Sequence, residues 1–456
     1  MTEPPDAPSR RTDALTSGAR SLLSSSVPVR RLLAWASFDW GAASFQAVIT
    51  SFVFATYLAD AVATEDGAVW ITVTNALTAV VVALGAAVVG QRADRLGQRR
   101  RTLLVLTIGV WICMALMSLV RPEPGYLPLG LVLLGLAGIF SEIGNASYYA
   151  MLQQVSTPRN VGAVSGFGWA MGYVGGIVLL LVGYFGFIAP EVGWFGVTGE
   201  DGMDVRAVVL VSTLWFVVFG LPLFLAVPES TPDHTLPRLG LVGSYRVLVR
   251  DLVQLWRVDR NAVRFLLASA LYRDGLAVIF SIGAVLAVSV YGLSAGDVLI
   301  FGVAANVVAA VGALVGGLVE DRVGPRLVIL VSVAALCVVG LVLLVVSGPT
   351  MFWVFGLALT LWVGPAQASS RALLTRLAPP GHEGQIFGLY TSTGRAVSFL
   401  APSLFALFAT IGSERTGILG IVLVLLAGGA VMLTVRNPRR PAEAADPAAP
   451  PAVTSS

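Results

Sequence analysis

Long apolar runs dominate the chain, and polar residues are confined to short intervals between them. Runs such as AVVVALGAAVV (79–89) and LVILVSVAALCVVGLVLLVV (327–346) lack the strict alternation of a membrane β-strand. A membrane-spanning helix needs about 20 apolar residues, so the pattern predicts helices. The spacing of the runs predicts twelve spans, near residues 32–59, 68–91, 101–120, 126–154, 161–189, 206–227, 262–291, 294–319, 326–347, 349–377, 384–411 and 415–436.

The composition argues against a soluble protein. Hydrophobic residues make up 56% of the 456 residues and charged residues 12%, roughly half the charged share of ordinary soluble domains. Such a chain cannot cover itself with a polar surface, which excludes a cytosolic enzyme, a nucleic-acid binder and a disordered chain. We expect an all-α integral membrane protein with a disordered arm (1–31), a six-helix bundle (32–227), a linker (228–261), a second six-helix bundle (262–436) and a disordered tail (437–456).

The basic residues, all 29 of them arginine, are distributed unevenly between the two ends of the predicted helices. They gather in the arm, between spans 2 and 3, in the linker and in the tail, whereas the opposite loops contain only Arg121, Arg206 and Arg415. Cytoplasmic loops carry an excess of basic residues, so we expect a multi-pass protein of the cell membrane with both termini in the cytoplasm. In the linker, apolar residues from Leu241 to Trp256 follow helical spacing, which predicts a basic amphipathic helix on the inner membrane surface or, alternatively, a soluble regulatory helix.

The cysteines and histidines do not suggest a disulfide or a metal-binding site. Cys113 and Cys337 fall inside predicted spans, where free buried thiols are expected rather than a disulfide. His234 and His382 fall in loops. We therefore expect no metal site and no cofactor.

An internal repeat relates the two bundles. The pattern G-x-x-x-D-R-x-G occurs at 90–97 and again at 317–324, an offset of 227 residues. At an offset of 222, NASYYAML (145–152) aligns with QASSRALL (367–374), and Gly162 aligns with Gly384. Parallel six-helix halves around a midplane site are typical of transporters.

The first copy of this pattern, in GQRADRLGQRRR (90–101), resembles the signature between helices 2 and 3 of the major facilitator superfamily. Further runs resemble the vacuole effluxer-like family within it: Asp39-Trp40, FSEIGNASYYAML (140–152), FLLASALYRDG (265–275) and GPAQASSRALLTRLAP (364–379). The resemblance covers residues 32–436 and implies the two-bundle transporter fold. Eukaryotic members of that family export amino acids from the vacuole. The chain has Arg273 and Arg395 where the family usually has Asn and Lys, which implies that its substrate can differ.

The repeated signature predicts a gate. Its glycines let helix ends approach closely, Asp94 can meet the N-terminus of a facing helix, and its arginines can bind carboxylates or phosphates. Such a cluster would hold the cytoplasmic side closed and break when the halves rock; the alternative is positive charge that only sets the topology. The predicted gate residues are Gly90, Asp94, Arg95, Gly97, Arg99, Arg100, Asp321 and Arg322.

Six ionisable side chains fall within the predicted spans, where a charge is costly and therefore marks a functional candidate. Three are acids and three are arginines, so they can neutralise one another; a structural ion pair between helices is the alternative for each. With two polar neighbours, the candidate substrate- or proton-binding residues are Asp39, Glu142, Asn145, Arg273, Asp274, Gln367, Arg371 and Arg395.

Together these features predict a secondary active transporter that works by alternating access, not an enzyme. The sequence has no Gly-Lys-Ser/Thr phosphate loop to support ATP-driven pumping. An arginine can hold a substrate carboxylate and an acid its amine, which suits an exported amino acid or similar zwitterion, with protons as the candidate coupling ion. The alternatives are a drug or metabolite exporter of the same superfamily and, more distantly, an ion channel. The expected partners of this monomer are a small-molecule substrate, membrane lipids and protons, with no nucleic acid.

Overall fold

The computed structural model describes residues 27–63, 66–229, 243, 245, 246, 250 and 260–437. Within these ranges it consists of helices and connections without a β-strand. Most of the predicted arm, nearly all of the tail and most of the amphipathic linker helix lie outside the described residues.

The first half of the chain forms six spans. The first span changes from α-helix to π-helix and back, because residues 45–52 and 58–62 are π-helical; such turns are often found at functional sites. The fifth span also ends in a π-helical turn. The helices are α2 (Val29–Ser44), α3 (Phe54–Tyr57), α4 (Gly67–Leu96), α5 (Arg99–Met117), α6 (Leu127–Ala150), α7 (Leu152–Val155), α8 (Val161–Gly183) and α9 (Met203–Ala226).

The second half repeats this arrangement. Its helices are α11 (Arg260–Ser289), α12 (Ala295–Val323), α13 (Pro325–Val345), α14 (Pro349–Leu377), α15 (Glu383–Val397), α16 (Leu400–Ile411) and α17 (Glu414–Leu433). In the ranges described, eleven helical stretches are long and apolar enough to cross a membrane, and the two parts of α11, which meet at 41°, complete a twelfth span. Many outward-facing side chains are aliphatic, such as Leu77, Leu225 and Val345, as lipid contact requires. The all-helical, twelve-span prediction is confirmed.

Two predicted boundaries were wrong in a way that matters for the signature. Helix α4 continues to Leu96 and α12 to Val323, so both copies of the repeated pattern are helical rather than parts of loops. The apolar pattern ends before the helix does, because charged residues occupy the last turns of α4 and α12. Arginines in these turns favour the helix, since positive charge is stabilised near a helix C-terminus. Each helix stops at the final glycine of the pattern, since Gly97 (φ 60°) and Gly324 (φ 92°) adopt backbone angles that other residues rarely adopt.

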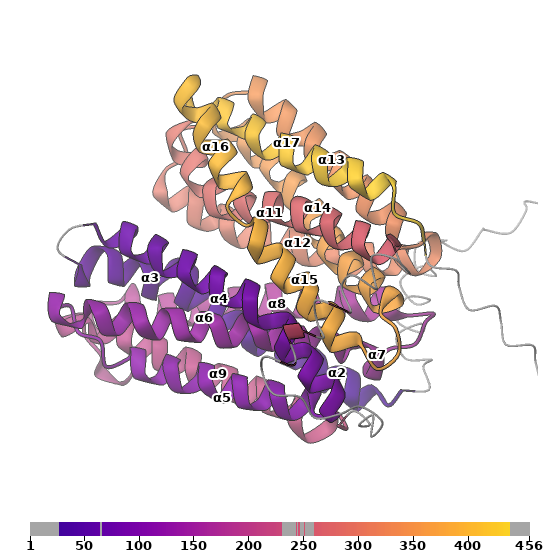
Figure 1. Cartoon of the computed structure of the whole chain (residues 1–456). Coiled ribbons are helices and arrows are strands. Elements are labelled where there is room, and N and C mark those ends of the chain that lie inside the picture. Colours follow the sequence, from indigo (N-terminus) through magenta and orange to yellow (C-terminus); the bar gives the residue numbers. More distant parts are fainter. Residues whose placement is uncertain are drawn as a thin grey trace, which may run out of the picture.

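The hydrophobic core has two main clusters, one around Trp35 and Met114 in the first half and one around Phe265 and Tyr272 in the second, and each also includes a few residues of the other half. The most extensive contacts between the halves are those of α4 with α15 and of α8 with α12, and smaller contacts join α6 to α15 and α8 to α14. Figure 1 shows the first half in indigo to magenta and the second in orange to yellow, with ribbons that converge near α7 and α15 and diverge toward α3 and α16.

Candidate functional site

The halves meet at one end of the bundle. We call the end with the connections 97–98, 156–160 and 378–382 the basic end, and the end with the connections 118–126, 189–202 and 346–348 the acidic end. Along α15 every side chain from Glu383 to Ser392 is buried, whereas Ala401 is the one buried residue of α16. The Ala87 amide donates to the Ser392 hydroxyl at 3.3 Å, and Ser392 is the last of the buried residues of α15. The halves are therefore closed against each other at the basic end.

The first copy of the repeated pattern forms the first clasp, which consists of Gly90, Asp94 and Arg99 with residues 383–385. The Asp94 carboxylate accepts hydrogen bonds from the amides of Gly384 (3.0 Å) and Gln385 (2.8 Å), at the N-terminus of α15. Arg99 binds Asp94 at 2.5 Å and also forms an ion pair with Glu383. A Cβ on Gly90 would lie 2.1 Å from the Gly384 carbonyl oxygen, so only glycine allows this approach.

The second copy forms the second clasp, which consists of Gly317, Glu320 and Asp321 with Gly162, Ala163 and Arg376. The Asp321 carboxylate accepts hydrogen bonds from the amides of Gly162 (2.9 Å) and Ala163 (2.8 Å), at the N-terminus of α8. Arg376, on α14, pairs with Asp321 at 3.2 Å and with Glu320. A Cβ on Gly317 would lie 2.4 Å from the Gly162 carbonyl oxygen.

The two clasps are related by the sequence repeat. Asp94 and Asp321 differ by the offset of 227, and their partners Gly384 and Gly162 differ by the offset of 222. In each clasp a carboxylate of one half lies at a helix N-terminus of the other half, where the unpaired amides and the helix dipole favour negative charge. Sequence reasoning missed Glu320, Arg376 and Glu383, although Glu320 stands next to the repeated aspartate.

The remaining signature arginines lie elsewhere. Arg95 and Arg322 occupy the last turns of α4 and α12. Arg100 stays within the first half, where its guanidinium donates to the carbonyls of Phe224 (3.3 Å) and Val227 (3.1 Å) at the end of α9. The structure therefore places Arg100 in a contact between neighbouring helices of one half, outside both clasps.

Asp39 and Arg371 form a buried ion pair between the halves. The Arg371 guanidinium on α14 contacts the Asp39 carboxylate on α2 at 3.2 Å and donates to the hydroxyl (3.0 Å) and carbonyl (2.7 Å) of Ser165 on α8. The Trp35 ring lies 4.8 Å and the Tyr149 ring 5.3 Å from its central carbon. The Arg371 side chain is 2% exposed, so its polar contacts are made with protein groups rather than with solvent.

Glu142 and Arg395 form a second ion pair between the halves. Glu142 lies on α6 and Arg395 in the last turn of α15, with Arg395 Nη2 2.5 Å from Glu142 Oε1 and Nε 3.3 Å from Oε2. The two side chains remain 38% (Arg395) and 24% (Glu142) exposed. The pair therefore lies at the edge of the contact between the halves and is accessible.

Arg273 and Asp274, which are adjacent on α11, both contact the eleventh span. The Arg273 guanidinium lies 3.8 Å from the centre of the Tyr390 ring and donates to the Tyr390 carbonyl at 3.3 Å. The Asp274 carboxylate accepts the Ala401 amide at 2.7 Å. Between these contacts the helix breaks into α15 and α16, a break the sequence prediction missed. Pro402 gave the signal, because proline disfavours the interior of a continuous helix.

Replacing Asp274 by alanine is expected to lower the melting temperature of the purified protein, whereas asparagine preserves most of it. Alanine leaves a buried amide of α16 without an acceptor, at a cost of about 1–3 kcal/mol, while an asparagine oxygen accepts the same hydrogen bond. Thermal unfolding of the two variants in detergent measures the difference. Equal melting temperatures for both variants, or loss of transport in Asp274→Asn protein that is stably folded, would contradict a structural role.

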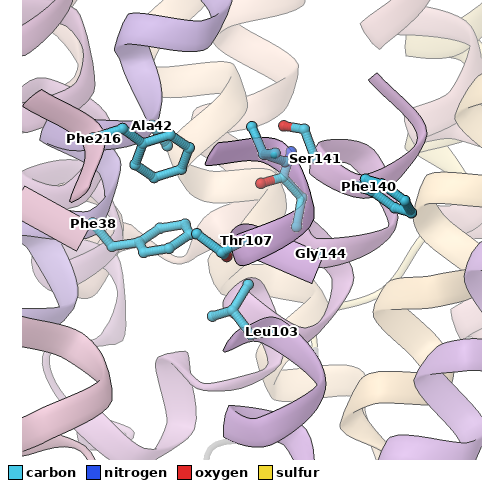
Figure 2. A pocket seen from close by; sticks show the side chains of 10 residues that line it. Phe38, Ala42, Leu103, Thr107, Phe140, Ser141, Gly144 and Phe216 are labelled. Atoms are coloured by element: carbon cyan, nitrogen blue, oxygen red, sulfur yellow. The ribbon is translucent and has the colours of Figure 1, made fainter. Parts of the chain in front are cut away.

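Two polar candidates lie apart from these ion pairs. Asn145 lines a small pocket within the first half, between α2, α5, α6 and α9. Figure 2 shows Phe38 and Phe216 on one side of this pocket, with Thr107 and Ser141 among its few polar groups. Gln367 is partly buried on α14.

Both cysteines are buried and free, as the sequence predicts. Within the described ranges, no three His, Cys, Asp or Glu side chains are placed to hold a metal ion.

Comparisons with known proteins agree with this architecture. A family model described as "Vacuole effluxer Atg22 like" matches residues 152–445. An uncharacterized MFS-type transporter of Bacillus subtilis, YxiO, is 21% identical over 407 residues, which cover 88% of this chain and 94% of that protein. Autophagy-related protein 22 of Cryptococcus neoformans is 24% identical over 311 residues, covering 64% of this chain and 52% of the relative, so the chain spans about half of that fungal protein.

A solved structure shows the same fold. The proton:xylose symporter of the major facilitator superfamily, bound to 6-bromo-6-deoxy-D-glucose, matches with a TM-score of 0.68 at 13% identity, covering 93% of this chain and 98% of the symporter. Identity this low indicates a shared fold and no more. Because the family model matches well over half of its residues, the chain belongs to the vacuole effluxer Atg22-like family of major facilitator superfamily transporters.

Proposed function

We propose that this chain is a secondary active transporter of the cell membrane that exports a small solute, such as an amino acid or similar zwitterion, by alternating access. The basic end faces the cytoplasm, in keeping with the rule that cytoplasmic loops are rich in arginine. The observation that carries the proposal is the pair of clasps, which join the two halves at this end through the same residues of the repeat. The described conformation is then closed to the cytoplasm.

The clasps suit a gate that must open repeatedly. A carboxylate at a helix N-terminus contributes about 0.3–2 kcal/mol, so each clasp holds through several moderate interactions rather than one strong one. Rocking of one half against the other separates α4 from α15 and α8 from α12, and it breaks both clasps together. Water then hydrates the separated helix amides, while Arg99 and Arg376 stay paired with the clasp aspartates of their own halves.

The ion pairs Asp39–Arg371 and Glu142–Arg395 also link the halves, so they too must separate when the basic end opens. Protonation of Glu142 would remove the charge that attracts Arg395 and would help the halves to part. A proton is therefore our candidate coupling ion, and Glu142, which is accessible, is its candidate carrier.

Transport by purified protein in liposomes tests the proposal. Uptake of radiolabelled amino acids is measured with and without an imposed pH gradient, and protein-free liposomes are the control. We expect saturable uptake whose initial rate changes with the imposed pH gradient. Single-channel currents would contradict a transporter, transport of bulky apolar drugs without amino acids would favour the alternative exporter, and insensitivity to the pH gradient would remove the proton.

A further inference from the structure

The ion pair between Glu142 and Arg395 differs from the other ion pairs between the halves by its exposure. The Arg395 side chain is 38% exposed, against 20% or less for the arginines of the clasps and of the Asp39 pair. Of these arginines, Arg395 is therefore the one whose side chain is least enclosed by protein groups.

A second arginine lies beside this pair. A Cβ on Gly394, the residue before Arg395, would lie 3.3 Å from Nη1 of Arg273. The Arg273 guanidinium rests on the Tyr390 ring and forms no ion pair with any residue that the structure describes. The carboxylate of Asp274, its neighbour, accepts the amide of Ala401 instead. Arg273 therefore places a positive charge near Arg395 that no carboxylate contacts directly, and this charge favours the approach of an anion.

The geometry of the pair indicates which anion fits. Nε and Nη2 of Arg395 contact the two different oxygens of Glu142, the forked arrangement in which a guanidinium binds a carboxylate. Glu142 belongs to the first half and Arg395 to the second. A carboxylate brought by a solute offers Arg395 the same two oxygens and leaves Glu142 free to move away with its own half.

Arg371 does not offer such a place. Its side chain is 2% exposed, and its donors are occupied by Asp39 and by the hydroxyl and carbonyl of Ser165. Aromatic rings of Trp35 and Tyr149 cover the guanidinium. Arg371 and Arg395 both pair with an acid of the first half. Of the two, Arg395 is the one whose carboxylate partner a solute can replace.

We propose that Arg395, assisted by the charge of Arg273, is the carboxylate-binding group of the transport site, and that Glu142 occupies it until a substrate carboxylate replaces it. The substrate class is organic carboxylates, of which amino acids are one kind, and the amine is not required for binding. This inference rests on the proposed transport function. Replacement removes one link between the two halves.

Three probes that share a phenethyl group separate the functional groups: phenylalanine, 3-phenylpropionate and phenethylamine. Acetate and formate are added because any site that accepts a carboxylate can admit them, and chloride controls for anions in general. Binding to purified protein is read from the melting temperature, since a ligand of the folded state raises it. The variants are Glu142→Gln, Arg395→Gln and Arg395→Lys, with Arg415→Gln, a partly exposed arginine at the acidic end, as the matched control.

We expect 3-phenylpropionate and phenylalanine to stabilise the protein and phenethylamine and chloride to have no effect. Glu142→Gln removes the competing carboxylate and should tighten carboxylate binding about tenfold, a difference of about 1.4 kcal/mol. Arg395→Gln should abolish binding, Arg395→Lys should restore part of it, and Arg415→Gln should leave it unchanged.

Three results would overturn the inference: stabilisation by phenethylamine equal to that by the acids, weaker carboxylate binding in Glu142→Gln, or no response of folded Glu142→Gln protein to any carboxylate. Uptake in liposomes distinguishes these from failure of the transport function. Uptake of a solute without a carboxylate would leave the transporter proposal standing and remove this inference, whereas loss of all uptake would remove both.

Discussion

Replacing Gly90 by alanine is expected to reduce transport about 5- to 150-fold while leaving each half folded. The new Cβ would lie 2.1 Å from the carbonyl oxygen of Gly384, and both positions are fixed by the backbone. The first clasp can then close only if α15 moves away from α4. Overpacking of this kind costs about 1–3 kcal/mol, which corresponds to that change in the population of the closed state.

A matched control lies on the same helix. A Cβ on Gly85 would meet Ile143 at 3.4 Å, an ordinary contact, so Gly85→Ala should transport like the unmodified protein. In the second clasp Gly317→Ala should behave like Gly90→Ala, with Gly302→Ala on α12, where a Cβ would meet nothing within 4 Å, as its control. Initial rates in liposomes compare the four variants. Equal losses in Gly85→Ala and Gly90→Ala would show that the close approach at the clasp is not the cause.

Replacing Arg371 by methionine is expected to destabilise the protein by about 3–5 kcal/mol and to abolish transport. The substitution leaves the Asp39 carboxylate and the Ser165 carbonyl without their partner in a buried site, and removal of one member of a buried ion pair has that cost. The measurement is the melting temperature in detergent, followed by uptake in liposomes.

The double variant Asp39→Asn/Arg371→Met removes both charges and should recover most of the lost stability, because no uncompensated carboxylate remains. Arg30→Met, at an exposed arginine of the first span, controls for loss of positive charge alone. An unchanged melting temperature in Arg371→Met protein would mean that the ion pair contributes nothing to holding the halves together.

The spans and the repeat were predictable because both are local properties of the sequence. Continuous apolar runs identify membrane helices, and the offset of 222 had already aligned Gly162 with Gly384, the two glycines that meet the clasp aspartates. The Asp94 contact with a helix N-terminus follows from the same pattern. The repeat did not predict which helix each aspartate faces, because each copy of the pattern contacts a helix of the opposite half.

The pairing of the membrane charges was not predictable in the same way. Whether Asp39 meets Arg371 or Arg395 depends on how the two halves dock, and no local pattern reports docking. The adjacent charges at 273 and 274 both contact the eleventh span because that span breaks near Ser398. Arg100 was assigned to the gate from its place in the signature, whereas its contacts depend on where α9 ends.

The clasps make a prediction about distances at the two ends of the bundle. Spin labels can be placed on exposed positions of both halves, at Arg101 and Leu327 for the basic end and at Glu123 and Thr350 for the acidic end. The native cysteines, Cys113 and Cys337, are buried. Labelled pairs are compared in the unmodified background, in Asp94→Asn/Asp321→Asn, and in Asp60→Asn, an exposed acid that serves as the control.

The most direct test of alternating access is the pair of distance distributions measured by pulsed electron spin resonance in Asp94→Asn/Asp321→Asn. Loss of both clasp carboxylates should add a longer distance for the label pair at the basic end and a shorter distance for the label pair at the acidic end, while Asp60→Asn leaves both unchanged. If both distances stay as they are, or if both lengthen together, the clasps do not hold a rocking pair of halves closed and the account is wrong.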